Sequence, residues 1–173
     1  MATSHVLLLT GKPGIGKTTV MRRVAAALAP SRIGGFLTDE IREGRARVGF
    51  RIVPFGGPAR VMAHVGRGGA ARVGRYGVDV ATIDAVAAEA LAPSPSVDLY
   101  LVDEIGRMEC LSRRFVAAMR VLLDSDRHVI ATVALRGEGF IAEVKRRRDV
   151  ELREVTLRDR DALPGAILEW LRE

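Results

Sequence analysis

Near its start, the chain carries a spacing of glycine, lysine and threonine that is typical of phosphate binding. Gly11 and Gly16 are followed directly by Lys17 and Thr18 in the pattern G-x-x-x-x-G-K-[ST]. Glycines allow backbone N–H groups to surround phosphate oxygens, and the N-terminus of a following helix adds partial positive charge. An apolar run at residues 6–9 precedes the loop and a helical apolar pattern follows it, which is the context that the pattern requires. We therefore expect residues 11–18, the phosphate-binding loop, to hold a polyphosphate.

Individual residues of this loop have distinct expected roles. Lys17 is expected to reach the β- and γ-phosphates and to take part in catalysis. The Thr18 hydroxyl is expected to bind Mg²⁺, and Thr19 to contact the nucleotide toward its α-phosphate. The predicted nucleotide-binding residues are Gly11, Lys12, Pro13, Gly14, Ile15, Gly16, Lys17, Thr18 and Thr19.

Two adjacent carboxylates follow a second apolar run. Residues 99–102 read Leu-Tyr-Leu-Val, and Asp103 and Glu104 come directly after them. Opposite a phosphate-binding loop, an Asp at a strand end can hold Mg²⁺ through water, and a neighbouring Glu can orient and deprotonate an attacking water. The predicted metal-binding residues are therefore Thr18 and Asp103, the predicted catalytic residues are Glu104 and Lys17, and the predicted cofactor is Mg²⁺.

A third strand end and several arginines complete the candidate site. We expect the strand that ends near Thr132 to lie between the loop strand and the acid strand. Thr132 would then be a polar sensor beside the γ-phosphate, or would make only a strand-end hydrogen bond. An arginine is also expected to neutralise charge in the transition state. Arg107, Arg136 and residues 146–148 are the candidates, with a solvated basic face as the alternative role for most of them.

Apolar periodicity and turn residues predict the elements that position these side chains. A helix over 17–29 should end at Pro30, and strands over 32–38 and 47–53 should form an antiparallel hairpin with a polar turn near Gly44. Asp79 and Ser112 are expected to cap helices. Further strands are predicted at 60–65, 99–102, 128–133 and 151–156, with a short strand and turn at 72–78 and helices over 137–147 and around 163–171.

The alternation of strands and helices predicts the fold class. It favours an α/β fold with a mainly parallel central sheet, helices on both faces and an antiparallel hairpin extension. The 173 residues suit a single domain over 1–173, long enough to bury a full core. No internal repeat, linker or low-complexity tail interrupts the pattern.

Cysteine content and hydropathy favour a cytoplasmic protein. The single cysteine, Cys110, excludes an internal disulfide and a cysteine-based zinc site, and a small buried hydrophobe is favoured over a reactive thiol. No apolar stretch approaches the roughly 20 residues that a membrane span needs, and the N-terminus lacks a signal-peptide pattern. We expect no membrane partner, and a monomer.

The charge balance is basic and dominated by arginine. Lysines and arginines outnumber aspartates and glutamates by 27 to 21, and only Lys12, Lys17 and Lys145 are lysines. This surplus permits phosphate or nucleic-acid binding, or serves solubility alone. The few aromatic residues are not interleaved with basic ones as a stacking platform would require, so a nucleic-acid partner is permitted but unsupported.

Six segments, in order along almost the whole chain, carry a family resemblance. Together they are similar to the small P-loop nucleoside-triphosphatases of the cancer-related NTPase family, also known from thermophiles. The Asp-Glu-Ile-Gly-x-Met-Glu run and the Tyr-Gly-Val-Asp segment make the resemblance specific. The segments are GKPGIGKTT at 11–19, GFLTDEIR at 35–42, RVGF at 47–50, GRYGVD at 74–79, DEIGRME at 103–109 and KRRRDVEL at 145–152.

The resemblance implies a fold and an activity. It implies a RecA-like P-loop NTPase fold, Mg²⁺-dependent hydrolysis of NTP to NDP and phosphate, broad tolerance of the base and slow turnover. Arg148 departs from the family pattern, which would place a proline there, but this position touches no predicted catalytic part.

The resemblance gives the middle motifs importance without assigning their chemistry. Asp39 and Glu40 approach the metal or an attacking water in one interpretation and belong to a hairpin turn in the other. Tyr76 either stacks on a base or packs under the sheet edge. Glu109 is expected to hold the loop that follows the acid strand.

The predicted function is hydrolysis of ATP, GTP, CTP and UTP with low base selectivity, with water activated by Glu104. A nucleoside or nucleotide kinase is the first alternative. It needs an acceptor pocket and usually a mobile lid with arginines, for which residues 66–75 and 136–148 are the only candidates. The second alternative is an NTP-dependent RNA-binding module, which predicts stimulation by nucleic acid and steep salt dependence.

Overall fold

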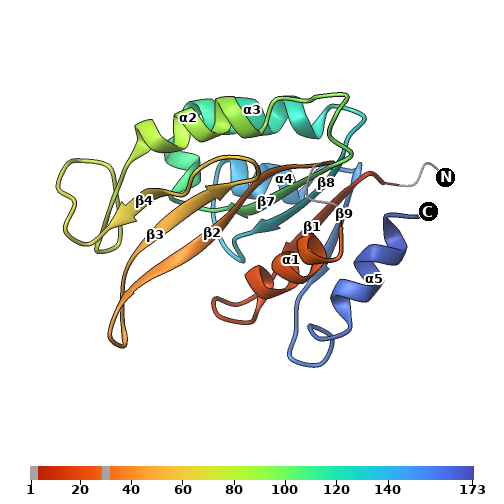
Figure 1. Cartoon of the computed structure of the whole chain (residues 1–173), viewed down its shortest axis with the longest axis horizontal. Coiled ribbons are helices and arrows are strands. Elements are labelled where there is room, and N and C mark those ends of the chain that lie inside the picture. The colour runs from red at the N-terminus through yellow and green to blue at the C-terminus, as the bar shows by residue number, and fades with distance from the viewer. Residues whose placement is uncertain (1–3, 29–31) are drawn as a thin grey trace.

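The computed structural model describes residues 4–28 and 32–173, and one nine-stranded sheet runs through them in the order β5-β6-β4-β3-β2-β7-β8-β1-β9 (Figure 1). The strands β2, β7, β8, β1 and β9 are parallel, and the remaining strands are antiparallel. The strands span β1 Val6–Thr10, β2 Ile33–Glu43, β3 Ala46–Pro54, β4 Arg60–His64, β5 Arg72–Val73, β6 Tyr76–Val78, β7 Leu99–Ile105, β8 His128–Val133 and β9 Val150–Glu154.

Helices cover both faces of the parallel part. In Figure 1, α2 and α3 lie side by side along one face, and α1 and α5 lie together on the other. The predicted fold class is thereby confirmed: a mainly parallel sheet, helices on both faces and an antiparallel extension. The helices span α1 Lys17–Ala26, α2 Val80–Ala90, α3 Arg113–Leu123, α4 Phe140–Lys145 and α5 Leu163–Trp170, with a short 3₁₀ helix, η2, at Glu109–Leu111.

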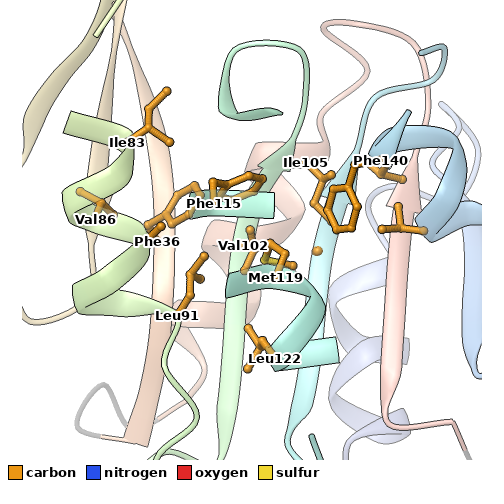
Figure 2. Packing of buried hydrophobic residues seen from close by; sticks show 14 of the residues in the cluster. Phe36, Ile83, Val86, Leu91, Val102, Ile105, Phe115, Met119, Leu122 and Phe140 are labelled. Atoms are coloured by element: carbon orange, nitrogen blue, oxygen red, sulfur yellow. The ribbon is translucent and has the colours of Figure 1, made fainter. Parts of the chain in front are cut away.

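The apolar residues of the sheet divide between two cores because successive side chains of a strand point to opposite faces. In β1, Val6 and Leu8 join the core under α2, α3 and α4, whereas Leu7 and Leu9 join the core under α1 and α5. Such double burial is typical of parallel strands. Figure 2 shows the larger core, where Phe36 lies against Phe115 with ring centroids 6.2 Å apart.

The order of the central strands brings the predicted site residues to one edge. As expected, β8 lies between β1 and β7, pairing Leu9 with Thr132 and Val102 with Ala131. Since parallel strands end at a common edge, the phosphate-binding loop, the acid pair and the end of β8 meet there.

The antiparallel hairpin is confirmed, but its strands are longer than predicted. β2 continues to Glu43, so that Asp39 and Glu40 lie in the strand, opposite Arg51 and Phe50, rather than in a turn. The turn is limited to Gly44 and Arg45, as the position of Gly44 suggests. Polar residues extend the strand here because the β3 backbone supplies hydrogen bonds that do not depend on side-chain hydropathy.

Helix ends agree with the predicted caps. The Asp79 carboxylate accepts a hydrogen bond from the Thr82 backbone N–H at 3.1 Å, and the Ser112 hydroxyl accepts one from that of Phe115 at 2.9 Å. α4 is shorter than the predicted helix over 137–147. The predicted end of the first helix, Ala29 and Pro30, lies outside the described residues.

Candidate active site

The phosphate-binding loop ends in a helix N-terminus whose backbone donors have no side-chain cap. Gly16 is the N-cap residue of α1, with φ +113°. Because glycine has no side chain, no side-chain oxygen occupies the free N–H groups at this helix end. The backbone conformation of Gly16 lies in a region that favours glycine, which explains the second glycine of the motif. The first turn of α1 contains no acidic side chain, so the N–H groups face an anion without local repulsion.

Lys17 is held over this loop by the loop's own backbone. Its Nζ donates hydrogen bonds to the carbonyl oxygens of Gly11 at 2.8 Å and Lys12 at 3.3 Å. The cation therefore stands where the predicted phosphates would lie.

The Asp103 carboxylate accepts hydrogen bonds from hydroxyl groups on three separate elements. The residue is 2% exposed. The Oδ2 atom accepts hydrogen bonds from Thr18 at 2.8 Å and from Thr38 at 3.2 Å, and Oδ1 accepts one from Thr132 at 2.7 Å. These contacts orient the carboxylate from α1, β2 and β8 at once.

The contact between Thr18 and Asp103 also tests the predicted metal site. Their oxygens are a hydroxyl and a carboxylate, the hard donors that Mg²⁺ takes from proteins alongside phosphate and water. The two side chains lie together at the inner end of the phosphate-binding loop, so the residues fit such an ion.

Thr132 makes a hydrogen bond at the end of its strand. Its side chain is fully buried and donates to Asp103, and it does not line the cavity described below. This hydrogen bond to the acid strand matches the second of its two predicted roles, and the role of a sensor beside the γ-phosphate stays a prediction. The bond orients the Asp103 carboxylate.

Glu104 is the second carboxylate at this edge, and it faces the cavity. Burial raises its pKa above the ordinary value, and the neighbouring Asp103 raises it further, whereas Lys17 and Lys145 act in the opposite direction. Gly106 gives this side chain its space, since a Cβ at that position would lie 2.6 Å from Glu104 Oε1. The carboxylate is thus partly desolvated and within the field of two lysines.

Glu109 lies beneath the same loop. It is 4% exposed, and a Cβ on Gly106 would lie 2.9 Å from its Oε2. Burial, together with the charge of Glu104, raises its pKa to about 8, although the backbone N–H groups of Glu109 and Gly106 oppose part of this rise. The side chain lies against Gly106 in the loop after β7, and its role in holding that loop stays a prediction.

Lys145 is a site residue that sequence reasoning missed. Its Nζ donates to the carbonyl oxygen of Leu135 at 2.8 Å, and its charge acts on both Glu104 and Lys17. Burial lowers its pKa, and so does the charge of Lys17. The rarity of lysine was the available signal, because all three lysines of an arginine-rich chain lie at this edge.

The arginine candidates separate into two groups. Arg107 and Arg136 line the cavity. Arg147 does not, and it is committed to Asp124 at 2.8 Å and Asp149 at 2.5 Å. Its neighbours in the 146–148 run are exposed, as a solvated basic face would be.

One cavity of about 980 Å³ is lined by the phosphate-binding loop, the acid pair, Glu109, Arg107 and Arg136, and not by Thr132, Lys145 or Arg147. Its near part is formed by the phosphate-binding loop and the acid pair, and its far part by Arg47, Phe50, Met62, Val73, Gly74 and Tyr76. Of the predicted nucleotide-binding residues, Ile15 alone does not line it. The lining residues among them are Gly11, Lys12, Pro13, Gly14, Gly16, Lys17, Thr18 and Thr19.

A second, smaller cavity lies on the other side of the loop. Its volume is about 230 Å³, and its lining includes Gly16, Thr19, Arg23 and Arg160. Arg160 donates a hydrogen bond to the carbonyl oxygen of Ile15 at 3.1 Å, which ties the segment after β9 to the phosphate-binding loop. The loop is therefore flanked by a cavity on each side.

The middle motifs lie in the antiparallel extension. Asp39 forms an ion pair with Arg22, and Glu40 pairs with Arg42 at 2.6 Å and with Arg47 at 3.2 Å. Glu40 lines the same large cavity as Asp103 and Asp39 does not, and the approach of either carboxylate to the metal or an attacking water stays a prediction. Tyr76 packs edge-on against Phe50, with ring centroids 5.2 Å apart, and is 8% exposed. Its packing under the sheet edge is confirmed.

Two general expectations can also be compared with the structure. Cys110 is free and partly buried beside the larger core, and burial raises the pKa of its thiol to about 12, as fits a small hydrophobe. Among residues 4–28 and 32–173, no helix has the length and apolar content to cross a membrane.

Comparison with known proteins gives this geometry a family context. The model of a protein family described as NTPase matches residues 6–168. Nucleoside-triphosphatase THEP1 of Thermotoga maritima is 36% identical over 167 residues, covering 96% of this chain and 95% of that protein. The THEP1 nucleoside-triphosphatase of Thermofilum pendens is 42% identical over 163 residues, covering 91% and 90%.

Two solved structures share the fold. The crystal structure of THEP1 from Aquifex aeolicus superposes with a TM-score of 0.88 at 31% identity, covering 97% of this chain and 99% of that one. The solution structure of a human cancer-related nucleoside triphosphatase gives a TM-score of 0.79 at 30% identity, covering 94% and 95%.

Proposed function

This chain belongs to the NTPase family and is a nucleoside-triphosphatase, and from that premise we propose that it is a Mg²⁺-dependent enzyme that hydrolyses NTP to NDP and phosphate with Glu104 as the base. The observation that carries the proposal is the convergence of Lys17, the Thr18–Asp103 contact and Glu104 in one cavity. These groups come from separate elements of the chain. They can act in one reaction because the fold brings them to the same cavity.

The chain's own groups divide the reaction between binding and proton transfer. Backbone N–H groups of the phosphate-binding loop and the Lys17 ammonium hold the phosphates. Glu104 accepts a proton from water while the water oxygen bonds to the γ-phosphorus, and the bond from that phosphorus to the bridging oxygen breaks to release NDP. Mg²⁺ bound by Thr18 and Asp103 would supply charge neutralisation on the phosphate oxygens.

We assign the remaining transition-state charge to Lys145 rather than to an arginine of residues 146–148. Its ammonium is in the field of both Glu104 and Lys17, whereas Arg147 is taken up by two aspartates. We place it beside the γ-phosphate because its Nζ bonds to the carbonyl oxygen of Leu135, which follows β8 and lines the large cavity. A fixed cation there stabilises negative charge that develops on the phosphate oxygens.

Low base selectivity follows from where the nucleoside would lie. Thr19 and the smaller cavity are on the side of the loop away from Asp103, where the base would meet the long side chains of Arg23 and Arg160. A guanidinium that stacks on a base discriminates poorly between bases, because every base has a π-face.

The proposal extends to the form of the protein. We infer a single domain over 1–173, because every described strand joins one sheet. We also retain the predictions of a monomer in the cytoplasm that binds nucleoside triphosphates. Light scattering after size-exclusion chromatography measures the oligomeric state, and a mass of twice 18.7 kDa would contradict the predicted monomer.

Phosphate release tests the activity directly. Wild type is incubated with Mg²⁺ and ATP, GTP, CTP or UTP, without acceptor, and is compared with Glu104→Gln. We expect hydrolysis of all four, and a loss of about 10²–10⁴-fold in the variant. Glu169→Gln, on the exposed side of α5, is the matched control and should keep full activity.

Binding of a fluorescent NTP distinguishes a loss of catalysis from a loss of nucleotide binding. Glu104→Gln should bind it as wild type does, because the variant loses a base and not a phosphate contact. Activity that persists in Glu104→Gln would contradict the role of this carboxylate. Phosphate release only in the presence of RNA would favour the nucleic-acid alternative.

A further inference from the structure

Glu109 is a buried acid that lines the large cavity, and the hydrolysis described above does not use it. Its side chain belongs to a residue that is 4% exposed, and it borders the same cavity as Glu104. No lysine, arginine or histidine among residues 4–28 and 32–173 forms an ion pair with it. A buried carboxyl group without a cation is costly to the fold, and beside a reactive group it is a candidate for a role in the reaction.

The backbone of Glu109 is fixed by the segment that follows β7. The Gly106 carbonyl oxygen accepts a hydrogen bond from the Cys110 backbone N–H at 3.0 Å, and the Glu109 carbonyl oxygen accepts one from that of Ser112 at 3.0 Å. The short helix η2 begins at Glu109, and Ser112 is the N-cap of α3. The Glu109 side chain therefore starts from a well-anchored point between the acid strand and α3.

Gly106 gives the Glu104 and Glu109 carboxyl groups a common space. A Cβ at position 106 would lie 2.6 Å from Glu104 Oε1 and 2.9 Å from Glu109 Oε2, so both oxygens lie within 2.9 Å of one point. A larger residue at position 106 would occupy the space that these two oxygens share. The two carboxyl groups are therefore neighbours at the wall of the cavity.

The electrostatics of this pair indicate which carboxyl group carries a proton. Burial raises the pKa of Glu109 to about 8, and the charge of Glu104 is the next cause. Burial and Asp103 also raise the pKa of the half-buried Glu104, but Lys17 and Lys145 oppose that rise. Since two cations act on Glu104, whereas its negative charge acts on Glu109, the proton of the pair belongs on Glu109.

We propose that Glu109 is a positioning residue for Glu104: its protonated carboxyl group donates a hydrogen bond to one oxygen of the Glu104 carboxylate and directs the other oxygen toward the attacking water. The inference rests on the proposed function, since Glu109 acts only through that base. A carboxylate has two acceptor oxygens, so Glu104 can accept from Glu109 and from water at once. During hydrolysis the proton of water passes to Glu104, and the proton of Glu109 stays in place.

Three substitutions at position 109 test the role of the donor. Glu109→Met keeps the length of the side chain but has no donor, and it should lower kcat for phosphate release about tenfold, with little change in KM for NTP. Glu109→Gln keeps a donor and should retain most of kcat. Glu109→Asp draws the acid back by one methylene group and should lower kcat in the same direction, so the test does not depend on the folding of Glu109→Met. Glu169→Met, on the exposed side of α5, is the matched control and should leave kcat unchanged.

Stability provides a measurement that a merely structural role would change in the opposite direction. At pH 8 the urea midpoint of Glu109→Met should be at least as high as that of wild type, because an apolar side chain replaces a buried acid that resists ionisation. We therefore expect kcat to fall without a fall in stability. A kcat that decreases in step with the urea midpoint across the three variants would contradict the positioning role.

A double variant tests whether Glu109 acts through Glu104. Single-turnover phosphate release at high enzyme concentration is compared for Glu104→Gln with and without Glu109→Met. The second substitution should change the residual rate by less than about twofold, because the base that Glu109 orients is already absent. A further loss of about tenfold in this background would overturn the positioning role.

The outcomes distinguish this inference from the proposed function. A loss of activity in Glu104→Gln, with unchanged kcat in Glu109→Met and Glu109→Asp, would overturn the positioning role and leave the proposed function intact. A kcat in Glu109→Gln as low as that in Glu109→Met would contradict the hydrogen bond as the means of positioning. Full activity in Glu104→Gln would instead overturn Glu104 as the base, and the positioning role with it.

Discussion

The parallel and antiparallel parts of the sheet are built from different residue patterns. Each residue of β1 is buried, as are almost all residues of β8, whereas β3 is a mixture of buried, half-buried and exposed positions. Parallel strands covered by helices on both sides form a rigid frame, whereas a half-exposed antiparallel sheet presents side chains to whatever binds beside it. The comparison teaches that the first part fixes the phosphate chemistry and the second shapes the space next to it.

The same difference is visible in the contacts of charged groups. At the edge of the parallel part, Asp103 and Glu109 are nearly inaccessible to water and have few alternative partners. In the antiparallel part, Glu40 and Arg47 are paired but remain exposed, at 40% and 44% of their side-chain areas. Substitutions should therefore have large effects in the first part and small effects in the second.

After the loss predicted for Glu104→Gln, the largest effect should come from removing the Lys145 cation. Lys145→Met is expected to lower kcat about 10²-fold, since an oriented charge at developing negative charge is lost, with little change in KM for NTP. Steady-state phosphate release measures it. Lys145→Arg should restore most of kcat, and Arg146→Met, at the exposed neighbour, is the control. A fall in Arg146→Met as large as that in Lys145→Met would show that the effect is not specific to the site.

A pH effect on stability should follow from Glu109. Its pKa is about 8 in the folded protein and near 4.5 in the unfolded chain, so between these values the folded state binds more protons. The free energy of unfolding should then fall as pH rises from about 4.5 to about 8, by on the order of a few kcal/mol, and level off above that. Urea denaturation of the ligand-free protein at several pH values measures this.

Glu109→Gln is the control for this titration, because an amide resembles the protonated acid but does not ionise. The free energy of unfolding of the variant should lack the fall with pH that the ionisation of Glu109 causes. The difference in this free energy, variant minus wild type, should therefore rise from pH 5 to pH 8. Parallel stability curves for the two proteins would mean that Glu109 is not the titrating group.

An intermediate effect is expected for the hydroxyl groups on Asp103. Thr132→Val removes a buried donor and leaves Oδ1 without this partner, which should cost about 1–3 kcal/mol of unfolding free energy in chemical denaturation. Thr38→Val, whose contact is longer at 3.2 Å and lies at the boundary with the antiparallel part, should cost less. A larger loss of unfolding free energy in Thr38→Val than in Thr132→Val would contradict the distinction between the parallel and antiparallel parts.

The smallest effect is expected in the antiparallel part. Glu40→Gln removes the partner of Arg42 and Arg47, but exposed ion pairs contribute only about 0–1 kcal/mol. The free energy of unfolding, measured at low and high salt, should change by less than that amount. A loss comparable to that of Thr132→Val would contradict the comparison.

Much of the parallel part was predictable because its signals are local. The motif at 11–18 and the apolar run before Asp103 each lie within one short segment, and the usual strand order of P-loop folds with a Glu beside the metal Asp predicts β8 between their strands. The family resemblance strengthened this reading. The meeting of Asp103 with Thr18 follows from strand order alone.

The missed features depend on contacts between distant segments. Thr38 reaches Asp103 only because β2 pairs with β7, with Phe36 opposite Val102. Lys145 reaches the site because its Nζ bonds to the carbonyl oxygen of Leu135, a contact between segments that the apolar periodicity of its own helix does not reveal. The strand at 39–43 was missed because its side chains are polar while its pairing is made by the backbone.

The concentration of lysines at one edge has a practical consequence for chemical modification. Every side-chain primary amine of the chain, on Lys12, Lys17 and Lys145, belongs to the phosphate-binding loop or its surroundings. An amine-selective acylating reagent therefore labels side chains only around the active site, whatever the number of arginines elsewhere. Mass spectrometry of the acylated protein thus becomes a direct measure of site occupancy, with bound nucleotide protecting Lys17.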